Sequence, residues 1–574
     1  MFATHIVKNA DEETVGYLVD NVFYTDYYLK QNIELVENIA VDNTGRICSD
    51  KELPCLSYAA AVTGKAYHDM VLKNPFMRDI QADLEEWKQE KNHGVLQLEG
   101  SRQIGKTTEL LKFAYRNYEY VLYVNFASDE YDFKDVIQNG CRLMEFEKYC
   151  RRAGLPHFKN SRQTILVLDE IQVSEQAYNA IRSIAASVDC DIVVTGSYLG
   201  QTIKNGYFLP AGTVTYMKMY PLSFAEFCRI YGKDSLLEQI DLYGSSAQSA
   251  YDELFALYDL YRYIGGYPAV IKKYIDNQNK EACYQIIADL LNTFEKESRN
   301  YFQASKETVI FKSVYREAMI ELCRERKGSG SKLVELVTTI VKSSEKLLVS
   351  RDEIANAIMW LIYSGIIGEC GCYVDGDMLS YRPARRLYYM DCGIAGYLVQ
   401  HCTNNGEYST RYLRQPRVVV SQQCHRIASF LRLVLTQISG TVFHRYLGNA
   451  ALGAETGMER GTIEGILTET FVFAELHRLY TARYSKKKVK GDTPSFSILG
   501  SNELDFLVFD KENKSYGIEV KTTDGAPKSL RVYRDKRLLD RAVVAKRTNG
   551  GHDGGIETIP VFAVGSRFPY DECV

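Results

Sequence analysis

The distribution of apolar and polar positions changes along the chain and predicts two kinds of structure. From about residue 93, short apolar runs alternate with helical stretches, and we expect strands at 95–98, 121–124, 164–168 and 191–194. Apolar runs of this length, bounded by turn or charged residues, are typical of parallel strands that are buried on both faces. The pattern therefore predicts an α/β core built on a parallel sheet.

Helical periodicity dominates after about residue 222, and strand signals return later. Short strand signals at 372–374, 378–381 and 387–390 follow predicted helices, an order that favours a winged helix. Strands are expected again at 504–509 and 516–520, separated by a turn. The predicted domains are, in chain order, an N-terminal extension (1–72), the core (73–222), a helical lid (223–308), a winged-helix-like region (309–400), a connecting helical segment (401–460) and a C-terminal α/β domain (461–574).

Composition narrows the class of protein without naming a partner. A chain of 574 residues predicts roughly three or four domains. Its 69 Lys and Arg nearly balance its 73 Asp and Glu, so the whole-chain charge favours no particular ligand. The 14 cysteines lack paired C-x-x-C spacing, which indicates reduced thiols and not a zinc site. No apolar run reaches the roughly 18 residues needed to span a membrane, so we expect a soluble, cytoplasmic protein with no membrane partner.

Residues 100–107 have the complete spacing G-x-x-x-x-G-K-T, between a predicted strand and a helix predicted at 108–115. Such a loop holds phosphate oxygens with its backbone amides and with the partial positive charge of the helix N-terminus. Lys106 is expected to reach the β- and γ-phosphates of ATP, and Thr107 to bind Mg²⁺. The residues predicted to bind ATP here are Gly100, Ser101, Arg102, Gln103, Ile104, Gly105, Lys106, Thr107 and Thr108.

An acidic pair follows the apolar run at 164–168. A carboxylate at the C-terminal tip of a buried parallel strand lies beside a P-loop, so Asp169 is predicted to bind Mg²⁺. Glu170 is then placed to orient and deprotonate the attacking water, which predicts an ATPase. Thr195 follows the next apolar run, either as a sensor of the γ-phosphate or as a capping residue, and both interpretations stay open.

Taken together, the motifs resemble those of bacterial and archaeal AAA-type ATPases that carry a C-terminal domain similar to PD-(D/E)XK nucleases. The matching segments are 100–108, 166–172, 195–197, 220–227, 265–268 and 388–394. The resemblance implies a P-loop parallel-sheet ATPase core, a helical lid, a winged-helix region and a C-terminal α/β nuclease-like domain. It also implies a ring of several copies as one oligomeric state. A monomer is the alternative.

The chain departs from that family at one position. Residues 211–213 read Ala-Gly-Thr where the family commonly has Ala-Gly-Arg. An arginine that contacts the transition state can contribute roughly 10³–10⁵ in rate. The sequence does not identify such an arginine finger in this chain.

The C-terminal domain has a second set of candidate residues. Glu469 lies on a predicted helix, Asp505 on a predicted strand, and Glu519 and Lys521 on one face of the next strand. The order Glu, Asp, Glu-x-Lys matches the PD-(D/E)XK pattern. The resemblance implies that Glu469, Asp505 and Glu519 bind metal while Lys521 orients the water that cleaves a phosphodiester.

Local charge favours a polyanion near these residues. Residues 483–550 contain 16 Lys or Arg and 9 Asp or Glu, although the chain as a whole is acidic. DNA or RNA is therefore a candidate partner. One interpretation is an ATPase that couples hydrolysis to nucleic-acid binding or processing. The alternatives are a regulatory ATPase whose nuclease-like domain is a non-catalytic interaction module, and a purely structural ATP site.

Overall fold

The chain forms two compact units. One consists of Met1–Gly100 and Gly105–Met219, and the other of Ser101–Ile104 and Tyr220–Val574. A computed structural model describes residues 3–8, 14–19, 22–25, 40–41, 47–48, 55–57, 67, 71, 74–91, 93–129, 131–155, 158–196, 214–301, 318, 322, 332–344, 350–373, 385–401, 460–482, 493–522 and 525–571.

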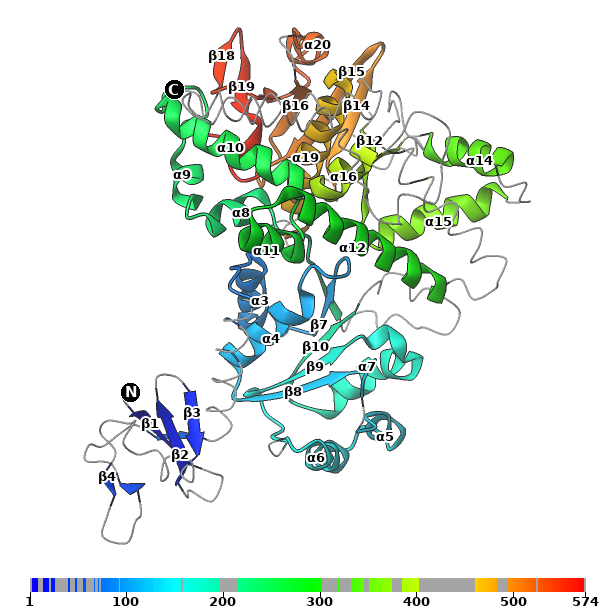
Figure 1. Ribbon diagram of the computed structural model, residues 1–574. Helices are drawn as coiled ribbons and strands as arrows, with labels where there is room; N and C mark the ends of the chain where they lie inside the picture. Colours follow the sequence, from blue (N-terminus) through cyan, green and yellow to red (C-terminus); the bar gives the residue numbers. More distant parts are fainter. Residues whose placement is uncertain are drawn as a thin grey trace, which may run out of the picture. The chain divides into compact units, whose positions relative to one another are not determined.

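The first unit is built on a five-stranded parallel sheet in the order β11-β7-β10-β9-β8. Figure 1 shows β7, β10, β9 and β8 side by side. Its strands are β7 (Val95–Glu99), β8 (Tyr120–Asn125), β9 (Thr164–Asp169), β10 (Asp191–Thr195) and β11 (Val214–Lys218). Its helices are α3 (Ile80–Gln89), α4 (Lys106–Asn117), α5 (Lys134–Gln138), α6 (Leu143–Arg152) and α7 (Glu175–Ser187), with the short turn η2 (Ile171–Val173).

All four strands expected in the core are present, and a fifth was missed. The side chains of β9 and β10 are buried throughout, as continuous apolar runs between covering layers must be. β11 escaped the sequence analysis because its residues read Val-Thr-Tyr-Met-Lys and its side chains are only partly buried. It pairs with β7 in parallel, which places the strand before the P-loop inside the sheet and not at its edge.

The N-terminal residues contain strands that the sequence analysis left without a structure. β1 (Ala3–Lys8) pairs with β2 (Thr14–Val19) and β6 (Cys55–Ser57), and β2 pairs with β3 (Val22–Thr25). A further two-stranded ribbon joins β4 (Ala40–Val41) and β5 (Ile47–Cys48).

The second unit combines helices with one large mixed sheet. Its helices are α8 (Phe224–Ile230), α9 (Asp234–Gln239), α10 (Gln248–Ile264), α11 (Pro268–Asn277), α12 (Lys280–Tyr301), α14 (Leu333–Ser344), α15 (Arg351–Tyr363), α16 (Cys392–His401), α19 (Arg460–Ala482) and α20 (Lys528–Asp535), with the short turn η4 (Val561–Ala563). Its strands are β12 (Ile367–Tyr373), β13 (Arg385–Tyr389), β14 (Ser495–Leu499), β15 (Asn502–Phe509), β16 (Ser515–Lys521), β17 (Arg541–Lys546), β18 (Gly551–Asp553) and β19 (Ile556–Pro560).

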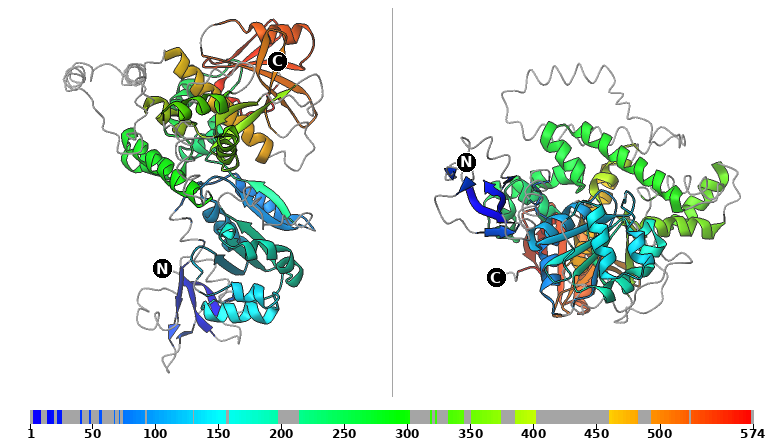
Figure 2. Two further views of the ribbon diagram at one scale, coloured as in Figure 1. Left: turned by 90° about the vertical axis from the view of Figure 1, so that its right-hand side faces the viewer. Right: turned by 90° about the horizontal axis from the view of Figure 1, so that it is seen from below.

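The eight strands follow the order β13-β12-β14-β15-β16-β17-β19-β18. The C-terminal strands of the sheet, coloured orange and red, lie together in the left view of Figure 2. β12 and β13, which were expected to form the ribbon of a winged helix, are the edge of this sheet, because β12 pairs in parallel with β14. The winged helix is therefore not confirmed, and the sheet extends across the boundary predicted at residues 401–460. The expected strand at 378–381 and the connecting segment 402–459 lie outside the described residues.

Three sequence motifs meet inside the second unit. The backbone amide of Leu222 donates to the carbonyl of Gly266 at 2.7 Å, and the amide of Gly266 donates to Asp391 Oδ2 at 2.7 Å. A Cβ atom at Gly266 would lie 2.2 Å from the Leu222 oxygen, and one at Gly393 would lie 2.4 Å from the Ile264 oxygen. The glycines at 265–268 and 388–394 are thus explained by close approach of backbones.

Helix α19 joins the same junction through a buried ion pair. Glu475 and Arg478 are both nearly inaccessible and are paired with each other, and Glu475 Oε1 accepts from the amide of Phe224 at the start of α8. Phe471 on α19 packs edge-on against Tyr258 of α10, with ring centroids 4.8 Å apart. The lid helices and the helix that precedes the C-terminal strands therefore share one core.

We expect Gly266→Ala to destabilise the second unit, because the new methyl group would collide with rigid backbone. Overpacking of this kind costs about 2 kcal/mol, or a fall in Tm of roughly 4–8 °C. Thermal unfolding of the full chain measures it. The matched control is Gly465→Ala on α19, where a Cβ meets nothing within 4 Å and Tm should hold or rise. Equal Tm values for the two variants would contradict the junction.

Candidate functional site: a P-loop and a separate carboxylate cluster

The P-loop lies between β7 and α4, as the sequence predicts. Gly100 and Gly105 have φ angles of 150° and 96°, values that residues with a Cβ atom rarely adopt. Lys106 opens α4, is buried, and donates from Nζ to the carbonyl of Gly100 at 2.9 Å. This bond folds the lysine side chain back onto the first residue of its own loop.

Asp169 occupies the position predicted for a metal ligand. It ends β9 with 3% of its surface exposed, and Thr107 Oγ1 donates to its Oδ2 at 2.8 Å. The amide of Glu170 donates to Oδ1 at 2.8 Å. Burial raises the pKa of the Asp169 carboxyl, although these hydrogen bonds oppose the shift.

The donor set fits a magnesium ion. A hydroxyl and a carboxylate are hard oxygen ligands, and they already contact each other one residue from a buried lysine. A divalent cation would also offset the cost of a buried negative charge on Asp169. The residues that would hold Mg²⁺ are therefore Thr107 and Asp169.

Tyr123 is a site residue that the sequence analysis missed. Its hydroxyl donates to Asp169 Oδ2 at 2.8 Å, and Asn125 Nδ2 donates to the tyrosine oxygen at 3.3 Å. Burial, followed by the Asp169 charge, raises the pKa of this phenol. Both residues lie on β8, and the pairing of Asn125 with Asp169 in the parallel ladder was the signal that could have found them.

Glu170 stands at the end of β9 in a left-handed backbone conformation, with φ of 50°. This conformation costs a residue with a side chain roughly 1 kcal/mol or more, and such strain is concentrated at functional sites. The carboxylate accepts a hydrogen bond from Gln172 Nε2, which fixes its orientation. Gln172 was also missed, although it lies two residues from the acidic pair.

Thr195 is completely buried, and its hydroxyl donates to the carbonyl of Leu98 on the adjacent strand at 3.0 Å. The hydroxyl proton is therefore used inside the sheet, and a sensor role would need this bond to break. Residue Ser197, in the matching segment 195–197, and the departure at 211–213 lie outside the described residues. The remaining P-loop positions, Ser101–Ile104, group with the second unit.

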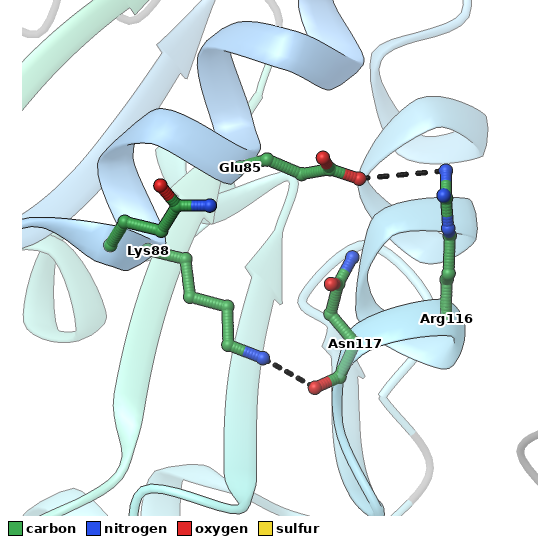
Figure 3. A pocket seen from close by; sticks show the side chains of 5 residues that line it. Glu85, Lys88, Arg116 and Asn117 are labelled. Carbon is green, nitrogen blue, oxygen red and sulfur yellow. Dashed lines mark hydrogen bonds and ion pairs between the residues drawn. The ribbon is translucent and has the colours of Figure 1, made fainter.

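A polar cavity of about 420 Å³ lies away from these residues, between α3 and α4. Figure 3 shows Glu85 directed toward Arg116, and Lys88 toward the carbonyl of Asn117. The Lys88 ammonium also lies 4.0 Å from the centre of the Tyr118 ring, and burial lowers its pKa. These contacts connect two helices of the core. None of the residues predicted to bind ATP lines this cavity.

The predicted C-terminal residues also come together, in the second unit. Asp505 on β15 accepts from the amide of Val520 at 2.8 Å, which places it at the tip of β16. On β16, Lys521 Nζ lies 2.6 Å from Glu519 Oε1, and Glu519 is 5% exposed. Burial and the charges of Glu469 and Glu519 raise the pKa of Asp505 to about 7. The four residues thus form one electrostatic cluster, called here the carboxylate cluster.

The carboxylate cluster is not a preformed metal shell. The Lys521 ammonium is paired with the Glu519 carboxylate, and the backbone amide of Val520 donates a hydrogen bond to Asp505. Within the part of the chain that the structure describes, no three acidic, histidine or cysteine side chains are arranged to hold a metal ion. The crowded negative charge attracts a cation, but binding one requires the carboxylates to rearrange.

Arg386 is buried in the surroundings of the carboxylate cluster. It is 2% exposed, lies 3.9 Å from the centre of the Phe496 ring and pairs with Glu503. Its charge opposes the rise in the pKa of Asp505. Sequence analysis could not place it there, because β13 joins this sheet only through long-range pairing.

Two family models match parts of the chain. Residues 92–228 match an AAA domain, and residues 256–405 match a domain of unknown function, DUF8612. Residues 92–228 are a P-loop AAA domain. Neither match reaches any residue of the carboxylate cluster, so the nuclease-like interpretation of 461–574 is not confirmed by them.

One curated relative is an uncharacterized protein of Haemophilus influenzae, 28% identical over 225 residues. The match covers 38% of this chain, and the chain spans about half the length (49%) of that relative. Within the described ranges, no helix has both the length and the apolar character needed to cross a bilayer.

Several solved structures match the chain at low sequence identity and low TM-score. The Aeropyrum pernix ORC1 protein in complex with DNA is 14% identical, with 58% of this chain and 92% of that chain covered and a TM-score of 0.24. Drosophila ORC bound to DNA is 10% identical, covering 62% and 95%, with a TM-score of 0.21. Thermotoga maritima RuvB is 14% identical, covering 52% and 88%, with a TM-score of 0.22. At these TM-scores the likeness does not extend to a shared overall arrangement.

We expect Lys106→Ala to weaken ATP binding by about 10- to 100-fold, because a charge-assisted contact to phosphate is lost from a buried site. Titration with a fluorescent ATP analogue measures the change. Lys134→Ala, an exposed lysine at the start of α5, is the control and should bind as the wild type does. Unchanged affinity in Lys106→Ala would place the nucleotide elsewhere.

Proposed function

We propose that the AAA domain binds ATP with Mg²⁺ and hydrolyses it. The observation that carries the proposal is the direct hydrogen bond between Thr107 and Asp169, beside buried Lys106. Retention of a nucleotide needs the loop alone. A buried carboxylate at the metal position, followed by a strained and oriented Glu170, is an arrangement suited to hydrolysis.

Each group has a distinct task in this proposal. Lys106 and the loop amides bind the phosphates, and Thr107 and Asp169 hold the Mg²⁺ that neutralises charge on them. Glu170 accepts the proton of the attacking water. Gln172 keeps that carboxylate in place through its hydrogen bond.

We further propose that hydrolysis controls nucleic-acid binding or processing by the carboxylate cluster. Two observations support it: Glu469, Asp505, Glu519 and Lys521 interact with one another, and helix α19 is followed by three antiparallel strands, α20 and a parallel strand. In this proposal the carboxylates bind Mg²⁺ and Lys521 orients the water.

The second candidate is a regulatory switch with a non-catalytic interaction module. The observation that favours it is the closed state of the cluster, in which Lys521 neutralises Glu519 and Val520 caps Asp505. In that case the cluster holds the sheet together, and ATP turnover acts on a bound partner. Both candidate functions include assembly into a homo-oligomer.

Glu170→Gln should reduce the ATPase rate by about 10²–10⁴, because the amide cannot take a proton from water, while ATP still binds. Single-turnover hydrolysis, with retained nucleotide measured in parallel, tests this role. Glu175→Gln, an exposed position at the start of α7, serves as the control with an unchanged rate. Equal rates for wild type and Glu170→Gln would remove the base assignment.

The nuclease candidate predicts Mg²⁺- or Mn²⁺-dependent cleavage of DNA or RNA that disappears in Lys521→Ala. Gel assays with single- and double-stranded substrates, with and without EDTA, measure it. Lys514→Ala, on the turn between β15 and β16, is the matched control. An inert wild type across these substrates and metals would leave the interaction module as the function of the cluster.

A further inference from the structure

Helix α20 packs one face into the core and exposes basic side chains on the other. Leu530 and Tyr533 are buried among the strands of the large sheet. Lys528 and Arg531, on the same helix, are exposed, and so are Lys536 and Arg537 in the turn that follows. Helix and turn carry five Lys or Arg but only one acidic residue, Asp535. This segment is therefore strongly positive on its solvent side.

The neighbouring cations already make hydrogen bonds or ion pairs. Arg534 bonds to Asp535 and to the carbonyl of Gly554, Arg541 bonds to Glu557, and Arg547 bonds to Asp259. For Lys528, Arg531, Lys536 and Arg537, no carboxylate partner is found among the described residues. We call these four residues the α20 basic face.

The helix is docked on the strands that carry the carboxylate cluster. The amide of Leu530 donates to Glu519 Oε2 at 3.2 Å, and Ser529 Oγ accepts from the amide of Glu503 at 3.3 Å. The first turn of α20 therefore begins at the carboxylates.

We propose that the α20 basic face binds the phosphates of a nucleic-acid strand and leads that strand to the carboxylate cluster. The inference rests on the proposed nucleic-acid function and names the surface that performs it. Four solvated cations that have no carboxylate partner among the described residues match the repeated charge of a phosphate backbone. Leu538, 49% exposed beside Arg537, adds an apolar contact for a sugar or base.

Arg537 offers a way to separate binding from folding. Its φ angle is 55°, in the left-handed region that glycine adopts without strain and other residues adopt at a cost. Arg537→Gly therefore removes a cation while relieving the backbone. A variant that is at least as stable as the wild type, yet binds nucleic acid less well, cannot be explained by unfolding.

The experiment measures fluorescence anisotropy of labelled single- and double-stranded oligonucleotides with the full chain, in EDTA, across a salt series. In the quadruple variant Lys528→Gln, Arg531→Gln, Lys536→Gln, Arg537→Gly, the slope of log Kobs against log salt should fall by about 3 to 4 for duplex DNA. Arg537→Gly alone should lower it by about 1, with an unchanged or higher Tm.

A control quadruple removes the same charge from exposed lysines and an arginine elsewhere: Lys134→Gln, Arg151→Gln, Lys272→Gln and Lys280→Gln. It should leave the slope within about one unit of wild type. Equal losses in the two quadruples, or no loss in the first, would overturn the proposal. Competition by poly-glutamate as strong as by oligonucleotide would also overturn it, in favour of an acidic protein partner.

This test is independent of turnover. Because EDTA removes divalent metal, it reports binding alone, and the ATPase and cleavage assays report the proposed activities separately. Loss of binding with intact ATP hydrolysis would locate the fault in the α20 basic face. Normal binding by that face with no cleavage would instead contradict the nuclease candidate.

Discussion

A buried carboxylate, Asp169, is the constraint on which the organisation of the AAA domain depends. An unpaired charge in that position would be strongly destabilising, so each of its oxygens must be bonded. Thr107 and Tyr123 supply hydroxyls to one oxygen, and the amide of Glu170 serves the other. These bonds connect the ends of β8, β9 and α4. The proposed metal position is thus also the point at which three elements of the core are held in register.

The second unit is organised by the same principle with different residues. Asp391 accepts hydrogen bonds from the amides of Gly266 and Ile394. Glu475 forms an ion pair with Arg478 and accepts a hydrogen bond from the amide of Phe224. Burial raises the pKa of both carboxyls, which shows how far they are removed from water. Buried carboxylates of this kind favour one arrangement of the chain, because only one packing satisfies all of their hydrogen bonds. Helix α19, which carries Glu469, is held by this junction.

The electrostatic properties of the carboxylate cluster result from the crowding of its carboxyl groups. Three carboxyls interact near the tip of β16, with Lys521 and Arg386 as the nearby cations. Arg386 comes from β13, more than a hundred residues before β15 in the chain. The site is therefore assembled from both sides of the segment 402–459. A domain boundary drawn from strand signals alone divides a sheet whose edge strands complete the surroundings of the site.

Local signals in the sequence determined the parallel core, the P-loop and the acidic pair, because each depends on a short run of residues with its own periodicity or turn chemistry. The matching order of Glu469, Asp505, Glu519 and Lys521 was also readable, and hairpin pairing brings the last three together. Tertiary structure alone decided the rest. β11, Tyr123 and Arg386 take their places through pairing between distant strands, and the glycines of two motifs through contact between distant backbones. Such contacts depend on which surfaces meet, and no short stretch of sequence encodes that choice.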